Sequence, residues 1–126
     1  MKNLKHTRIS YDIGCQTEDL AGQFLEKNGF KILERNFRSR SGEIDIIAQD
    51  GQTLCFVEVR ARAKIEQGHP FETISAVKKR RLTQTILFYL SKRGLDDCPM
   101  RFDAIALTEN GGGWTIEHIK NACDFS

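Results

Sequence analysis

Several features that would assign this chain to a known class are missing from its sequence. No apolar run approaches the ~18 residues that a helix needs to cross a bilayer. The first six residues lead into no apolar stretch, so we expect no secretory signal and a cytoplasmic protein without a membrane partner. A glycine-rich phosphate loop, a dinucleotide-binding fingerprint and a nucleophile elbow are also absent.

Cysteine and proline are scarce. No two cysteines form a C-x-x-C pair, and no Cys/His cluster has the spacing of a zinc site. We therefore expect four reduced thiols, some of them in the core. Both prolines fall between periodic segments, and no repeat or linker divides the chain. The residues in question are Cys15, Cys55, Cys98, Cys123, Pro70 and Pro99.

The length and composition are those of one ordinary globular domain. The chain has 126 residues, of which 40% are hydrophobic and 29% charged. A chain of this length buries roughly two thirds of its unfolded surface, so it needs no disulfide or metal to fold. We expect a single domain over residues 1–126, with a disordered arm over residues 1–10.

Hydrophobic periodicity predicts two helices and five strands. The helices cover residues 13–28 and 75–93, and Gly29 and Gly94 follow as stop signals. The predicted strands are residues 30–37, 42–48, 53–60, 100–107 and 114–119, the last of them at an edge, with a loop over 61–71. This order predicts an α/β (α+β) fold in which helices flank a mixed sheet.

Basic residues gather in three segments, although the net charge is only 19 − 17 = +2. Such clusters favour local binding of phosphate groups, and for any one cluster alone a solvated face is the alternative. The candidate residues for binding nucleic acid are Arg35, Arg38, Arg40, Arg62, Lys64, Lys78, Lys79, Arg80 and Arg81.

Acidic residues interrupt two apolar strands that form a predicted hairpin. Asp50-Gly51 predicts a two-residue turn between them. In that register Glu43 opposes Glu58, and Asp45 lies diagonal to Glu58 on the same face, within roughly 7 Å. A four-residue loop would place Asp45 directly opposite Glu58, whereas a three-residue loop would put them on opposite faces.

Two carboxylates that meet on an apolar strand pair repel each other and lose hydration, so something must offset their charge. Mg²⁺ suits this role, because it prefers one or two carboxylates together with water and phosphate oxygens. Arg60, two residues after Glu58, would add a positive charge for a phosphodiester transition state. A salt-bridged network explains the pattern equally well, with Arg60 bound to Glu43 or Glu58 and with Asp45 capping a backbone donor.

The two strands that carry these acids closely resemble the signature of the YraN family of small bacterial proteins. The matching segments read GEIDII over residues 42–47 and FVEVRAR over residues 56–62. That family is related to the restriction-endonuclease-like, or PD-(D/E)XK, nuclease fold. The resemblance covers nearly the whole chain, with further matches at residues 18–21, 29–36, 78, 82 and 101–103, and it implies a restriction-endonuclease-like αβββαβ core.

The resemblance also implies a role for each matching residue. Asp45 and Glu58 would bind the metal with the carbonyl of Val59 as a third ligand, and Glu18 would orient water or a second metal. Arg60 stands where the broader nuclease motif carries lysine. Arginine does not deprotonate in proteins, so Arg60 cannot act as a general base, but it can hold a phosphate by two parallel hydrogen bonds. The attacking water would then need activation by metal, or help from Lys78 or Glu18.

These observations favour an endonuclease that depends on Mg²⁺ or Mn²⁺ and hydrolyses DNA, at branched or flapped structures. Two alternatives stay open: a nuclease-like fold that binds nucleic acid without cutting it, and a protein-interaction domain in which the acids are structural. The sequence leaves the oligomeric state open, a homodimer included.

Four smaller features complete the predictions. Arg101 and Asp103 share a strand face and predict an ion pair, and Trp114 is expected to cover the sheet edge. His69 is interpreted as a loop histidine, and His118 has no evident partner.

Overall fold

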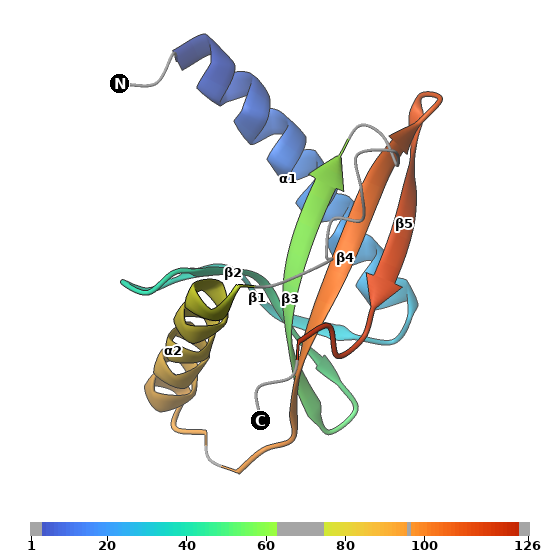
Figure 1. Ribbon diagram of the computed structural model, residues 1–126. Coiled ribbons are helices and arrows are strands. Elements are labelled where there is room, and N and C mark those ends of the chain that lie inside the picture. Colours follow the sequence, from blue (N-terminus) through green and yellow to red (C-terminus); the bar gives the residue numbers. More distant parts are fainter. Residues whose placement is uncertain (1–3, 63–74, 96, 124–126) are drawn as a thin grey trace.

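The computed structural model describes residues 4–62, 75–95 and 97–123, and within these ranges two helices lie on opposite faces of a five-stranded sheet (Figure 1). The elements are α1 (Leu4–Lys27), β1 (Lys31–Arg38), β2 (Glu43–Asp50), β3 (Thr53–Arg62), α2 (Ala76–Arg93), β4 (Met100–Asn110) and β5 (Gly113–Ile119). The predicted order of helices and strands is therefore confirmed.

The sheet is mixed, and its strands follow one another in chain order from β1 to β5. Every neighbouring pair is antiparallel except β3 and β4, which run parallel. A parallel pair needs a crossover connection, and α2 lies within it. β5 is an edge strand as predicted, and its partly buried Trp114 packs against the core cluster on the α1 side.

Two apolar clusters hold the helices to the sheet. On one side, Leu82, Ile86 and Tyr89 of α2 pack against strand residues that include Phe56. On the other side, α1 packs against the sheet through residues that include Leu25. Burying a large aliphatic or aromatic side chain stabilises the fold by roughly 1.5–3 kcal/mol, so these stripes fix both helices.

The ends of α2 follow local signals in the sequence. The Ser75 side chain accepts a hydrogen bond from the backbone N–H of Lys78, which satisfies one of the free donors of the first turn. Gly94 ends the helix with a φ of 65°, a left-handed conformation that costs glycine little. No helix in the described part of the chain has the length and hydropathy of a membrane span.

Several element boundaries differ from those predicted, most of all the start of α1 and the ends of β3 and β4. α1 begins at Leu4 and not at residue 13, so residues 4–12 belong to the helix. Nothing before Gly14 breaks a helix there, although the apolar periodicity starts later. β3 continues to Arg62 and β4 beyond Thr108, because these two residues still pair in the parallel ladder. Residues 63–74, with His69 and Lys64, lie outside the described ranges.

A buried polar cluster ties β5 to β4. Asp103 is fully buried, and it receives hydrogen bonds from Arg101 and from the backbone N–H of Asn121. The predicted ion pair between Arg101 and Asp103 is thus confirmed, with Nε 2.8 Å from Oδ1. The expectation that His118 lacks a partner is wrong, because its Nε2 lies 2.9 Å from Asp103 Oδ2.

All four cysteines are free thiols, as predicted, and Cys55 is the buried one. Burial is the main reason that the pKa of the Cys55 thiol rises to about 11.

Candidate functional site

The turn of the β2–β3 hairpin lies one residue further along the chain than predicted. Asp50 pairs with Thr53, so the two turn residues are Gly51 and Gln52. Gly51 has a φ of 62°, which glycine adopts without steric cost. The diagonal arrangement expected for the two acids is therefore wrong, because that register would have placed Asp50 within the turn.

The actual register makes Asp45 and Glu58 the next residues beyond the end of the β2–β3 ladder, whose last pair is Ile46 and Val57. Here the two strands separate. Asp45 Oδ2 accepts the backbone N–H of Val59 at 2.8 Å, which satisfies a donor at the point where the ladder stops. Asp45 and Glu58 line one cavity of about 200 Å³, which Lys78 and Leu82 of α2 help to enclose.

Glu58 binds two cations through one of its oxygens. Its Oε2 accepts hydrogen bonds from Arg60 Nε and from Lys78 Nζ, both at 2.8 Å. Its other oxygen, Oε1, is buried and has no hydrogen-bond partner among the described residues. A buried oxygen without a partner costs free energy unless a donor or a cation satisfies it.

Both features of the salt-bridged network considered above are present: Arg60 binds Glu58, and Asp45 caps a backbone donor. Each of these contacts uses only one oxygen of its carboxylate. The network therefore leaves a second oxygen on each acid for another ligand.

The electrostatic environment of Asp45 is unfavourable for its negative charge. Its pKa is raised to about 6 from an ordinary value of 3.8. Burial is the main cause, the hydrogen bond from Val59 opposes it, and the charges of Glu18, Glu43 and Glu58 add to it. Carboxylates from α1, β2 and β3 thus surround Asp45, and their charges add to the cost of burying its own.

Asn36 of β1 holds two of these acids, a role that sequence reasoning missed. With its amide nitrogen turned toward them, Asn36 donates to Glu18 Oε1 at 3.1 Å and to Glu43 Oε2 at 3.3 Å. Asn36 has a φ of 56°, uncommon for a residue other than glycine but tolerated by asparagine. An asparagine within an otherwise regular strand was the one sequence feature that could have indicated this role.

Part of the predicted nucleic-acid-binding set is engaged in ion pairs within the protein. Arg35 Nη1 lies 2.7 Å from Asp19 Oδ1, and Arg35 Nη2 lies 3.6 Å from Glu18 Oε1. These contacts, the hydrogen bond to Asp19 most of all, raise the pKa of Arg35. Arg38 pairs with Glu43 at 3.4 Å, and Lys78 with Glu58.

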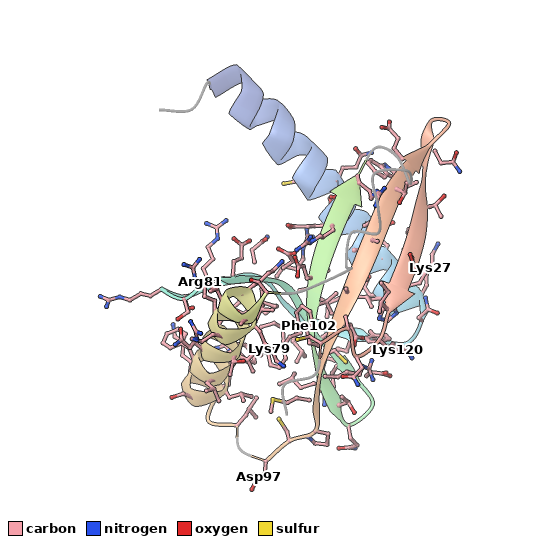
Figure 2. All side chains as sticks on the ribbon, in the orientation of Figure 1. Lys27, Lys79, Arg81, Asp97, Phe102 and Lys120 are labelled. Carbon is pink, nitrogen blue, oxygen red and sulfur yellow. The ribbon has the colours of Figure 1, made fainter. Side chains whose placement is uncertain are left out.

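Three arginines of that set are exposed, without such a partner in the described ranges. Arg40, Arg80 and Arg81 are exposed and form no ion pair among the residues that the structure describes. Figure 2 places Arg81 and Lys79 on opposite sides of α2. Arg62 lies at the end of β3.

The donor set suits a hard divalent cation. No three Asp, Glu, His or Cys side chains within the described ranges converge closely enough to hold a metal ion by themselves. Mg²⁺ does not require such a cage, because it keeps several waters and takes one or two carboxylates together with substrate oxygens. Asp45 and Glu58 match this requirement, because each has one oxygen that no described residue engages.

The chain matches proteins of one bacterial family along most of its length. The model of the uncharacterised protein family UPF0102 matches residues 17–107. A UPF0102 protein of Persephonella marina is 47% identical over 116 residues, which cover 92% of this chain and 97% of the relative. A UPF0102 protein of Geobacter metallireducens is 45% identical over 115 residues, covering 90% and 93%. One of Desulforapulum autotrophicum is 44% identical over 110 residues, covering 87% and 91%. The chain belongs to the uncharacterised protein family UPF0102.

Proposed function

We propose that this protein is an endonuclease that uses Mg²⁺ or Mn²⁺ to hydrolyse DNA phosphodiester bonds at branched or flapped structures. One observation carries the proposal: Asp45 and Glu58 line the same cavity, and among the described residues each has one oxygen fixed by a hydrogen bond and one that is not. A divalent cation would satisfy the buried Glu58 Oε1 and offset the burial and the carboxylate repulsion that together raise the pKa of Asp45.

The order of the elements supports kinship with restriction-endonuclease-like nucleases. The strand that carries Asp45 and the strand that carries Glu58 follow the first helix, and α2 then closes the cavity from the other side. In this proposal Asp45, Glu58 and the carbonyl of Val59 hold the metal ion. When bound, the ion supplies Lewis-acid stabilisation and makes water a better nucleophile at neutral pH.

The two cations beside Glu58 would act on the phosphate and on the water. Arg60 cannot accept a proton, so its guanidinium serves to hold the phosphate and to stabilise charge that develops on its oxygens. Lys78 reaches Glu58 from the first turns of α2, so its ammonium can orient the attacking water at the same cavity. Glu18, held by Asn36, would order a further water.

Cleavage assays test this proposal. Purified protein is incubated with flap, four-way junction and linear duplex DNA, with Mg²⁺, with Mn²⁺ or with EDTA. We expect cleavage with metal only, and a loss of at least about a hundredfold in Asp45→Ala and in Glu58→Ala, because the metal contributes several kcal/mol to the barrier. Glu26→Ala, at an exposed acid on α1, serves as the matched control and should cut like the wild type. Absent cleavage, or cleavage that survives both site substitutions, would refute the proposal.

A second candidate function is nucleic-acid binding without hydrolysis. The double ion pair at Glu58 favours it, because two cations already neutralise one of the two acids. This function predicts salt-sensitive DNA binding that persists in Glu58→Ala and weakens when residues 78–81 are replaced by glutamine. Binding that is unchanged by the second replacement would contradict it.

A further inference from the structure

A second hollow lies on the outer side of α2, next to the loop that joins β1 and β2. It is lined by Ser39, Arg40 and Ser41 of the loop and by Gln84, Leu87 and Phe88 of the helix. Leu87 is 58% exposed and Phe88 is 45% exposed. The Phe88 ring rests against the buried Phe37, with 6.0 Å between the ring centroids, so part of an aromatic surface stays open to a ligand.

The hollow is held in shape by contacts between its two walls. The hydroxyl of Ser39 lies 3.2 Å from that of Thr85, which is fully buried. Thr85 also donates to the backbone carbonyl of Arg81, within α2. The loop is therefore fixed to the helix, and a ligand would not have to order it first.

The charge around the hollow is positive. None of its six lining residues is acidic. Arg40 on the loop and Arg81 on α2 are exposed and have no ion-pair partner in the described part of the chain. The ammonium of Lys92 lies 5.6 Å from the centroid of the Phe88 ring. Such a surface complements a ligand that combines negative charges with flat apolar rings.

The hollow lies along the helix that also reaches the acidic cavity. Arg81, Gln84 and Phe88 follow one another at spacings of three and four residues, so they share one side of α2. Lys78, which lines the acidic cavity, precedes Phe88 by ten residues, or about 15 Å along the helix axis. Figure 1 shows the β1–β2 hairpin passing the N-terminal end of α2. Both the acidic cavity and this hollow are lined by residues of that hairpin and of α2.

We infer that this hollow binds a single-stranded segment of nucleic acid beside the bond that is cut, with one base stacked on Phe88. Arg40 and Arg81 contact the phosphates on either side of that base. A paired base in a duplex keeps both of its faces covered by its neighbours, so Phe88 selects unpaired nucleotides. The inference rests on the proposed function, of which it specifies the substrate: DNA with a single-stranded arm.

Fluorescence anisotropy with a labelled oligothymidylate, and with a duplex of equal length, tests the inference. The measurements are made in EDTA on the full chain carrying Glu58→Ala, so that cleavage cannot interfere. Phe88→Leu keeps an apolar side chain but removes the stacking surface. We expect it to weaken binding of the single strand about tenfold and to change duplex binding by less than about twofold. Leu33→Ala, at a 39% exposed side chain on β1, is the matched control and should alter neither.

The salt dependence provides a second readout. Arg81→Gln should lower the slope of log affinity against log salt by about 0.7 for the single strand.

Equal losses for both DNAs in Phe88→Leu, or no loss, would overturn the inference, as would a wild-type affinity no greater for the single strand than for the duplex. A dimer in sedimentation velocity that Phe88→Leu dissociates, with DNA binding unchanged, would assign the hollow to a second copy instead. Single-strand binding that depends on Phe88 in a protein without nuclease activity would refute the proposed catalysis and keep the hollow only as a binding site for single strands.

Discussion

Asp45→Asn is expected to raise the free energy of unfolding in metal-free buffer at pH 7.5 by up to about 3 kcal/mol. The carboxyl of Asp45 has a pKa of about 6 in the folded protein, against 3.8 for an ordinary aspartate. That difference corresponds to about 3 kcal/mol, because one pKa unit is worth about 1.4 kcal/mol. Asparagine removes the charge but keeps an oxygen that can accept the N–H of Val59.

The difference in stability between the wild type and Asp45→Asn should depend on pH. Because its pKa is raised, Asp45 binds a proton more tightly in the folded state than in the unfolded state. Wild-type stability therefore falls as the pH rises from about 4 to about 6, and the cost is fully present above pH 6. Urea unfolding of wild type and variant at pH 4.5 and 7.5 measures it: the advantage of Asp45→Asn should be larger at pH 7.5.

Divalent metal should stabilise the wild type but not the Asp45→Asn variant. Mg²⁺ in the millimolar range should raise the melting temperature of the wild type and leave that of Asp45→Asn almost unchanged, because binding to the folded state alone stabilises it. Glu26→Gln, at an exposed acid of α1, should respond to metal like the wild type. If Asp45→Asn is less stable than the wild type and metal stabilises neither, the acids are structural, as in the protein-interaction alternative.

The convergence of Asp45 and Glu58 was predictable because side chains alternate along any strand. The sequence predicts a turn formed by Asp50 and Gly51, whereas the turn in the structure is formed by Gly51 and Gln52. Both are two-residue turns, so the pairing shifts without exchanging the faces of the strands. Glycine tolerates a positive φ at either central position, so the turn motif alone did not settle the register. In the observed register Ile47 pairs with Phe56, and both side chains lie in the apolar cluster on the α2 side.

The contacts that complete the site were not predictable, because they join elements far apart in the sequence. Asn36 meets Glu18 across 18 residues, and Lys78 meets Glu58 across 20 residues. No local pattern encodes how α1 and α2 sit on the sheet, which the two apolar clusters determine. His118 was missed for a related reason: the β4–β5 register brings it to Asp103, and a glycine-rich turn does not fix that register on its own.

Asp103→Ala is expected to lower the free energy of unfolding by about 3–5 kcal/mol, the largest loss of stability that we expect from a single substitution. Asp103 is fully buried, and its carboxylate is the common partner of Arg101 and His118. Removing Asp103 leaves His118 without this partner and leaves Arg101 with Asp50 alone, at 3.1 Å, and breaking a buried ionic cluster in this way is strongly destabilising. Asp19→Ala is the matched control. The ion pair of Asp19 with Arg35 is 2.7 Å long, close to the 2.8 Å of Asp103 with Arg101, but it is exposed. Its loss should therefore cost less than about 1 kcal/mol.

The same cluster should govern the stability of the protein in acid. Burial alone would raise the pKa of Asp103, but hydrogen bonds from His118, Arg101 and Asn121 outweigh it and lower the pKa to about 2. A lowered pKa means that the contribution, about 2.5 kcal/mol, is fully present above pH 4 and is lost as the pH falls toward 2. The stability gap between wild type and Asp103→Asn should therefore shrink between pH 4.5 and pH 2.5 in urea titrations. A gap that stays constant over this range would mean that Asp103 stabilises the fold through packing and not through its charge, since packing does not depend on pH.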